Sequence, residues 1–290
     1  MTPTSTPTRA RPATVPSDDR VRRVPGQLFA VMLGLLLLLQ GCQRADAPAK
    51  RQDQLVVFAA ASLREAFGKL ALEFEEGHPH ATVSFNFAGT QEIRTQLEQG
   101  AAADVFASAD TRQMALLVEA RRVESPSVFA QNEPVLVVAK DSVSSIRALS
   151  ELPRAERIVI GAPEVPIGKY TLQILQNASQ AYGANFSDRV QARVVSRELN
   201  VRQVLAKVTL GEADAGIVYR SDVGAAGQGV GVVTIPREIN VTAQYPMALV
   251  RGAAHFALGS AWCALVLSDK GQAILRAAGF SPPPLVEAKR

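Results

Sequence analysis

The stretch LVVFAAASLREAF, residues Leu55–Phe67, runs from an apolar strand through three alanines and a serine into a helix. Strand-to-helix turns of this kind are the building unit of α/β proteins. Alanines at the turn allow the helix to pack close to the sheet. They also leave room in front of Ser62 for something other than protein. The stretch therefore raises the question of a ligand site as well as of a fold.

Apolar strands and amphipathic helices alternate along the rest of the chain, which predicts an α/β fold with a largely parallel sheet. About 235 residues follow residue 53, and domains typically hold roughly 100–150 residues, so two small α/β lobes are favoured over one sheet. Strands are expected at 55–58, 81–87, 104–108, 135–138, 158–160, 193–195, 215–218, 230–235 and 245–250. Helices are expected at 62–76, 90–99, 114–120, 168–182, 201–211, 253–267 and 269–278.

The net charge of the 290-residue chain is +4, but its basic character lies mostly in the leader. Residues 1–41 hold five Arg and two Asp, which is +3, so about +1 remains for the rest. The sequence after the leader therefore lacks the basic footprint of a nucleic-acid-binding protein.

The leader has the pattern of a bacterial lipoprotein signal peptide. An apolar run, Leu28–Leu39, follows a cluster of arginines and is too short to span a bilayer comfortably. It ends in Leu39-Gln40-Gly41-Cys42, which resembles a lipobox. We expect a signal peptide over 1–41, lipidation of Cys42 and a polar tether over 42–53. An ordinary secretory leader with a chance cysteine is the alternative. With Cys42 lipidated, Cys263 stands alone, which excludes a disulfide framework.

The most informative feature is the set of helix starts that follow strands. In an open α/β sheet such turns gather at the carboxyl edge, where ligands bind, and each presents free N–H groups at the positive end of a helix dipole. Several of them together suit a small oxyanion. A hydroxyl that caps a helix accepts a hydrogen bond and can still donate one to an anion. The four starts are Ser62-Leu63-Arg64-Glu65 (a capping-box pattern), Gly89-Thr90-Gln91-Glu92, Pro166-Ile167-Gly168, and Asn200-Val201-Arg202 with Asn200 as N-cap.

These residues carry a family resemblance. The chain resembles the molybdate-binding proteins of bacterial ABC importers over roughly residues 54–280. The resemblance implies a two-lobed periplasmic-binding-protein-like fold, in which each lobe is a mixed, mostly parallel sheet flanked by helices and two strands form the hinge. It also implies lobe 1 over 54–134 with 248–290, and lobe 2 over 135–247. The matching stretches are VVFAAASLREAF (56–67), FAGTQEIRTQLEQGAAADVFASAD (87–110), GAPEVPIGKYTLQIL (161–175), NVRQVLAKVTLGEADAGIVYRSD (200–222) and YPMALV (245–250).

The resemblance implies an extracytoplasmic, monomeric binding protein that delivers molybdate, or tungstate, to an ABC permease and its ATPase, and the leader predicts its lipid anchor at Cys42. No cofactor is implied, and molybdenum would be present only within bound molybdate. Oxyanion contacts carried over by position are Ser62 and Thr90 through hydroxyl and amide, Ile167 and Val201 through amides, and Tyr219 through its phenol.

Other chemistries fit the residues less well. The Gly-Lys pair in GAPEVPIGKY lacks P-loop spacing, and Ser62 lacks a nucleophile elbow and an evident base. We interpret His78 and His80 as a solvated turn rather than metal ligands, and Arg202 as a helix-surface residue. The remaining alternatives are another oxyanion such as sulfate, or an enzyme or sensor on the same scaffold.

Overall fold

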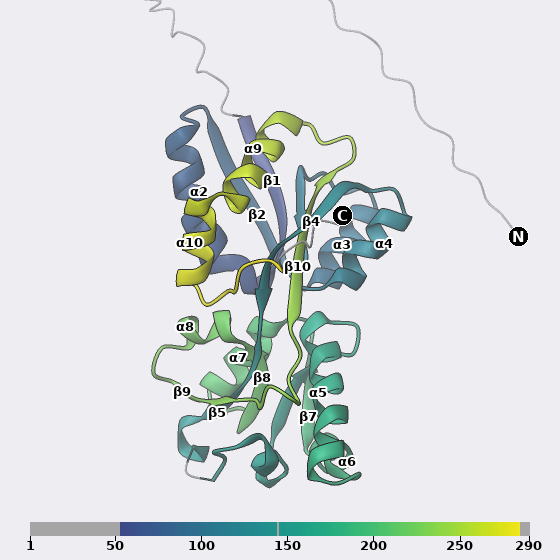
Figure 1. Ribbon diagram of the computed structural model, residues 1–290, viewed down its shortest axis with the longest axis vertical. Coiled ribbons are helices and arrows are strands. Elements are labelled where there is room, and N and C mark those ends of the chain that lie inside the picture. The colour runs from purple at the N-terminus through teal and green to yellow at the C-terminus, as the bar shows by residue number, and fades with distance from the viewer. Residues whose placement is uncertain (1–52, 144, 285–290) are drawn as a thin grey trace, which may run out of the picture. The chain divides into compact units, whose positions relative to one another are not determined.

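Two five-stranded sheets form the framework of the protein, whose computed structural model describes residues 53–143 and 145–284. Both sheets lie in one compact unit of the chain (Figure 1). The predicted signal peptide and Cys42 fall outside the described residues, as does the tether up to residue 52. Among the residues that are described, no helix is long and apolar enough to cross a membrane.

Sheet A has the strand order β2-β1-β3-β10-β4. Helices α2, α9 and α10 cover one face, and α3 and α4 cover the other (Figure 1). Its strands are β1 (Asp53–Ala60), β2 (Ala81–Ala88), β3 (Val105–Ala107), β4 (Val123–Asn132) and β10 (Ala243–Val250). Its helices are η1 (Ala61–Leu63), α2 (Arg64–Gly77), α3 (Thr90–Glu98), α4 (Thr111–Glu119), α9 (Phe256–Leu267) and α10 (Asp269–Ala277).

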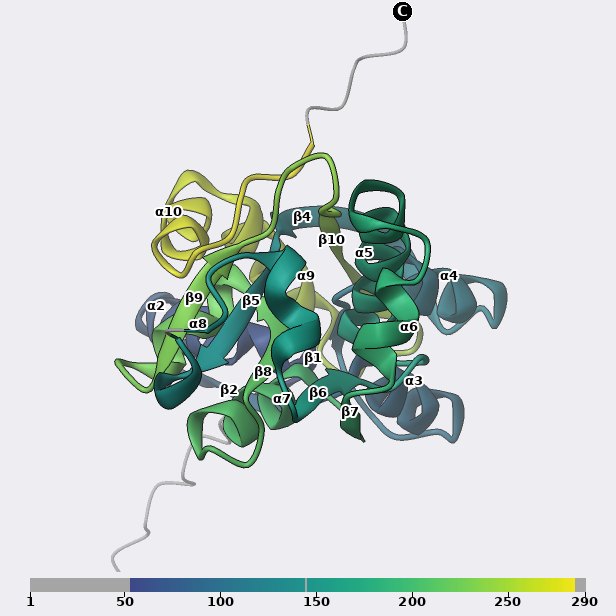
Figure 2. The same cartoon turned by 90° about the horizontal axis from the view of Figure 1, so that it is seen from below.

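Sheet B has the matching order β7-β6-β8-β5-β9. Helices α5 and α6 lie on one side of it, and α7 and α8 lie on the other (Figures 1 and 2). Its strands are β5 (Pro134–Ala139), β6 (Ile158–Gly161), β7 (Val194–Glu198), β8 (Ala215–Tyr219) and β9 (Val230–Thr234). Its helices are η2 (Lys140–Ser142), η3 (Leu149–Arg154), α5 (Pro166–Tyr182), α6 (Phe186–Gln191), α7 (Val201–Thr209), η4 (Arg220–Asp222) and α8 (Val223–Ala226).

The two sheets share one topology. In each, three neighbouring strands are parallel, and the fourth in order, β10 or β5, is antiparallel to both of its neighbours. Four of the five strands in each sheet therefore point the same way, which confirms the predicted mixed, mostly parallel sheets. The chain passes between the sheets twice, at Glu133 and over 235–242. The predicted lobe boundaries stay a prediction, because strand pairing defines sheets rather than separately folding units.

The sequence prediction found nine of these strands but missed β4. Pro126 lies inside β4 and cannot donate a ladder hydrogen bond, which argues against a central strand. The structure resolves the conflict by placing β4 at the edge of sheet A, where residues 125–127 are exposed. Helix α6 was also missed, since six residues are too few for a clear periodic pattern.

The apolar core of sheet A's α2/α9 side is built around Trp262, which is fully buried. Its indole packs edge-on against Phe67, Phe74 and Phe85 at centroid distances of 5.3–5.7 Å. Trp262 lies in α9, so this C-terminal helix turns its buried side toward the core. This cluster fixes α2, and hence the turn before it, against the sheet.

Gly168 lies in the first turn of α5, where that helix starts against the end of β6. A Cβ at this position would lie 2.0 Å from Ala162 O and 2.5 Å from Gly161 O. Gly168→Ala should therefore lower the free energy of unfolding by about 1–3 kcal/mol, because the backbone must shift. Urea unfolding measures the change.

Gly68 provides the matched control. It lies on the exposed face of α2, and a Cβ there would meet nothing within 4 Å. Gly68→Ala should raise stability by about 0.5–1 kcal/mol, through the helix propensity of alanine. Equal effects of the two variants would contradict the proposed close approach at Gly168.

Candidate functional site

A small pocket lies where the carboxyl ends of β1, β2 and β8 and the starts of several helices meet. Its volume is about 20 Å³. That is room for a water molecule or one small ion, against roughly 300–1,000 Å³ for a typical organic ligand. All five predicted oxyanion contacts line it and all five are buried. The lining residues are Ala60, Ala61, Ser62, Ala88, Gly89, Thr90, Ala109, Val165, Pro166, Ile167, Asn200, Val201 and Tyr219.

Ser62 lies in η1, before α2, and does not cap its own helix. The N-cap of η1 is Ala60 without a side-chain bond, and the Ser62 hydroxyl instead lies 2.9 Å from the Tyr245 hydroxyl. Glu65, the other half of the predicted capping box, forms an ion pair with Arg202. The capping-box prediction is therefore wrong, because partners distant in sequence take both side chains.

Thr90 is the first residue of α3, and Gly89 is its N-cap. The Glu92 carboxylate accepts from Gly89 N at 2.9 Å, and the Thr90 hydroxyl oxygen accepts from Ala109 N at 3.2 Å. Since the oxygen already accepts a bond, the Thr90 O–H remains available as a donor.

The two helix starts of sheet B offer backbone donors. Asn200 caps α7, accepting from Arg202 N and Gln203 N at 3.0 and 3.1 Å, which confirms the predicted N-cap. This leaves the Val201 N–H as the uncapped amide of that turn. Helix α5 begins with Pro166 and has no side-chain cap, so the Ile167 N–H, which has no intrahelical acceptor, also lies at an uncapped start.

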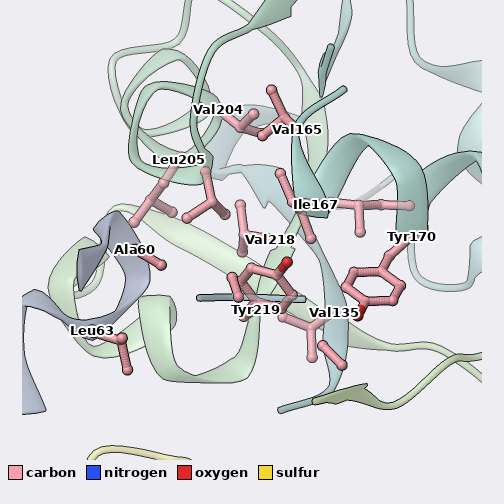
Figure 3. Close-up of a cluster of buried hydrophobic side chains, with 14 of the residues drawn as sticks. Ala60, Leu63, Val135, Val165, Ile167, Tyr170, Val204, Leu205, Val218 and Tyr219 are labelled. Atoms are coloured by element: carbon pink, nitrogen blue, oxygen red, sulfur yellow. The ribbon is translucent and has the colours of Figure 1, made fainter. Parts of the chain in front are cut away.

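Tyr219 ends β8, and its ring lies between Ala60 and Ile167 in the close-up (Figure 3). The hydroxyl is buried and has no hydrogen-bond partner within the described part of the chain. Burial raises the pKa of Tyr219 well above its ordinary value, and nearby Tyr245 raises it further. The phenol therefore keeps its proton, and its O–H is available to donate a hydrogen bond to a bound acceptor.

No residue that lines the pocket carries a formal charge. The donors are hydroxyls and the backbone amides of helix starts, whose dipoles favour an anion. A general base is missing from the lining for the same reason, as it contains no His, Asp, Glu, Lys or Cys. The arrangement offers a small anion several hydrogen-bond donors and no charged partner.

Charged residues form a layer behind the pocket. Arg202 lies with its Nε 3.1 Å from Asp222 Oδ1 and also pairs with Glu65 of α2, so it links the two sheets' helices. Its side chain is only 18% exposed, so the prediction of a helix-surface arginine is wrong. Asp222 in turn accepts from Tyr219 N at 3.1 Å, which fixes the end of β8.

Further contacts join the two lobes beside the pocket. Gln91 Nε2 donates to Leu199 O at 2.7 Å, and Gln113 Nε2 donates to Glu164 O at 3.1 Å. Asp110, the N-cap of α4, lies 3.9 Å from Lys169 Nζ on α5. Gln91, Gln113 and Lys169 were not predicted as functional, because a single sequence contains no signal for contacts between distant segments.

The predicted turn at His78 is stabilised locally. His78 Nδ1 lies 2.9 Å from Phe74 O, and its ring stacks on Phe74. Across residues 53–143 and 145–284, no group of three or more His, Cys, Asp or Glu side chains is placed to hold a metal ion.

Comparison with known proteins identifies the family. The family described as "Bacterial extracellular solute-binding protein" matches residues 55–281. The chain belongs to this family. Its members bind solutes outside the cytoplasm, which confirms the predictions of a binding protein rather than an enzyme and of an extracytoplasmic location.

Two curated relatives are similar in sequence over two thirds or more of this chain. The molybdate-binding protein ModA of Mycobacterium tuberculosis is 39% identical over 263 residues, covering 89% of this chain and 97% of the relative. The ModA of Escherichia coli is 33% identical, covering 69% and 79%. The predicted membership of the molybdate-binding protein family is thereby confirmed.

Solved structures confirm the two-lobed fold. The Azotobacter vinelandii periplasmic molybdate-binding protein matches with a TM-score of 0.70 at 22% identity, covering 79% of this chain and 99% of that one. The sulfate-binding protein SubI of Mycobacterium tuberculosis matches with a TM-score of 0.72 at 19% identity, covering 79% and 87%. At these identities the likeness concerns the fold alone.

Asp222 makes stability depend on pH in a definite direction. Burial raises its pKa from 3.8 to about 6, although Arg202 and the Tyr219 N–H act the other way. A carboxyl whose pKa is raised by folding stabilises the protein below the unfolded pKa, and this stability is lost as pH rises through the folded pKa. The unfolding free energy of the wild type, relative to Asp222→Asn, should therefore fall by about 3 kcal/mol between pH 3.8 and about 6.

Asp214 is the matched control of opposite sign. Burial opposes its ionisation, but hydrogen bonds and the ion pair with Arg157 leave its pKa lowered. The free energy of unfolding of the wild type, relative to Asp214→Asn, should therefore rise as the pH rises. Urea unfolding across the acidic range measures both differences, and parallel curves for Asp222→Asn and the wild type would contradict the raised pKa.

Proposed function

We propose that the protein captures molybdate, with tungstate as a second ligand, and delivers it to an ABC permease driven by an ATPase subunit. The observation that carries the proposal is a small pocket without charged residues, in which hydroxyls and helix-start amides meet and where the Tyr219 phenol has no hydrogen-bond partner among the described residues. The names of the 33–39% identical relatives support the choice of anion.

The proposed contacts are the Ser62 and Thr90 hydroxyls and amides, the Ile167 and Val201 amides, and the Tyr219 phenol. Molybdate is a dianion without a proton at neutral pH, so it accepts hydrogen bonds only and suits a site of donors. Hydrogen phosphate carries a proton that would find no acceptor here and would cost binding free energy.

Binding is proposed to draw the lobes together. Ser62 and Thr90 lie in helices that pack on sheet A. Ile167 and Val201 lie in helices that pack on sheet B, and Tyr219 ends one of its strands. An anion reaches the full set of donors only when both lobes face it, so it favours the closed state. A monomer held at the membrane by lipid on Cys42 is the proposed form that meets the permease. Sulfate or another oxyanion is the alternative ligand.

Calorimetric titration of residues 50–290, the compact unit that holds both sheets, tests the ligand. Molybdate, tungstate, sulfate and phosphate are titrated in parallel. We expect strong heats with molybdate and tungstate and none with sulfate or phosphate, because the neutral donor pocket suits a dianion of one size. Binding of sulfate alone would contradict molybdate as the ligand but would leave the assignment as an oxyanion-binding protein. No heat of binding with any of the four anions would refute an oxyanion site.

Tyr219→Phe separates binding from stability. Removing the phenol should weaken molybdate binding by about 1–3 kcal/mol, which is one charge-assisted hydrogen bond. Because the hydroxyl has no partner among residues 53–143 and 145–284, the unliganded variant should be at least as stable as the wild type. Titration and thermal unfolding measure the two effects.

Tyr182→Phe, at the end of α5 and away from the pocket lining, is the control and should leave affinity unchanged. Unaltered affinity in Tyr219→Phe would remove Tyr219 from the site.

A further inference from the structure

Arg202 lies between two carboxylates that belong to different lobes. Its Nε is 3.1 Å from Oδ1 of Asp222, which lies in η4 on the sheet B side, as Arg202 itself does in α7. Its Nη2 forms an ion pair with Glu65, in the first turn of α2 on the sheet A side. One partner of the arginine therefore stays with it when the lobes separate, and the other does not.

The two carboxylates differ in burial. The Asp222 side chain is fully buried, whereas the Glu65 side chain is 41% exposed. Asp222 therefore compensates the charge of Arg202 within one lobe, whether or not Glu65 is near. Glu65 lies where water can solvate its carboxylate once the pair is broken. The pair between the lobes can thus form and break without leaving a buried charge alone.

The ion pair lies beside the pocket and outside its lining. Val201, with its proposed donor amide, directly precedes the arginine, and Asp222 accepts from Tyr219 N at 3.1 Å. On the opposite lobe, Glu65 follows Ser62 by three residues. Helix α7 and η4 pack against η1 at this place. The ion pair and the proposed anion therefore cross the same boundary between the lobes.

We propose that the Glu65–Arg202 ion pair is a latch that forms when the lobes close, so that these two positioning residues raise the affinity for the anion without touching it. The inference rests on the proposed function. An anion that holds the lobes together also brings Glu65 to Arg202. By linkage, the ion pair favours the anion-bound state by the same factor as the anion favours the ion pair.

The sign of the effect distinguishes a latch from a simple local charge. Glu65 carries a negative charge close to a site proposed for a dianion, and like charges repel. If repulsion alone mattered, removal of the Glu65 charge would strengthen anion binding. Removal of a contact that exists only between closed lobes weakens it instead.

The test is Glu65→Gln, which keeps the shape of the side chain and removes its charge. Calorimetric titration of the protein with molybdate, at low and at high ionic strength, measures the affinity. At low ionic strength we expect binding to weaken about 2- to 5-fold, the range of a partly exposed ion pair. The difference from the wild type should shrink at high ionic strength, because salt screens such a pair.

Glu73→Gln is the matched control. Glu73 lies on the same helix, α2, and its ion-pair partner is Lys270 of α10, which covers the same face of sheet A. The substitution removes the same charge from the same helix, but the broken pair lies within one lobe. We therefore expect the affinity for molybdate to stay unchanged at both ionic strengths.

A double-mutant cycle with Arg202→Gln assigns the effect to the pair. In the Arg202→Gln background, Glu65→Gln should no longer weaken binding, because the latch is already absent. Arg202→Gln leaves the buried Asp222 without its cation. If that variant fails to fold, the sign and the salt dependence of Glu65→Gln decide alone.

Unchanged or tighter binding by Glu65→Gln would overturn the inference, as would a loss that is the same at both ionic strengths. An equal loss from Glu73→Gln would overturn it too, since the effect would then belong to the charge of α2. A wild type that binds no molybdate overturns the proposed function and the inference with it. A wild type that binds molybdate as well as Glu65→Gln does overturns the inference alone.

Discussion

The central physical constraint at the pocket is a set of buried hydrogen-bond donors that have no acceptor in the described part of the protein. The Tyr219 hydroxyl has no partner in the described chain, and the starts of α5 and α7 leave amides uncapped at the same place. A buried polar group left unpaired costs about 1–3 kcal/mol, so the fold holds these donors ready at some expense of its own stability. An acceptor that bonds to all of them would recover that free energy, which is the physical basis of the anion binding that we propose.

Charge is kept one layer away from the pocket and is paired there. Arg202 lies between Asp222 and Glu65, and Lys169 lies near Asp110. A cation in the pocket would attract any anion of suitable charge, whereas dipoles with fixed directions discriminate by where the acceptors lie and whether a proton is present. The paired charges serve instead to join the lobes and to hold the end of β8, where the Asp222 carboxylate fixes Tyr219.

Features that depend on residues close together in the sequence could be predicted. Features that depend on contacts between distant residues could not. Helix starts at Thr90, Pro166 and Val201 are visible because strand, turn and helix patterns lie within a few residues of each other. The capping role of Ser62 was wrong because Tyr245, 183 residues away, takes its hydroxyl. β4 was missed because its edge position, which tolerates Pro126, is a property of the whole sheet. Family resemblance selected the five contacts, whereas the contact between the Ser62 and Tyr245 hydroxyls became visible only in three dimensions.

Small residues line the pocket where the strands of sheet A end. Ala60, Ala61, Ala88 and Ala109 line the pocket on the sheet A side, and Gly89 stands where that lobe touches the other. A Cβ on Gly89 would lie 2.3 Å from Leu199 O, so a larger residue there would hold the lobes apart. Small residues thus allow the helix starts of both sheets to approach to within reach of one ion. The close approach at Gly89 and the small side chains of the lining therefore act together, because both keep the helix starts of the two lobes close to one another.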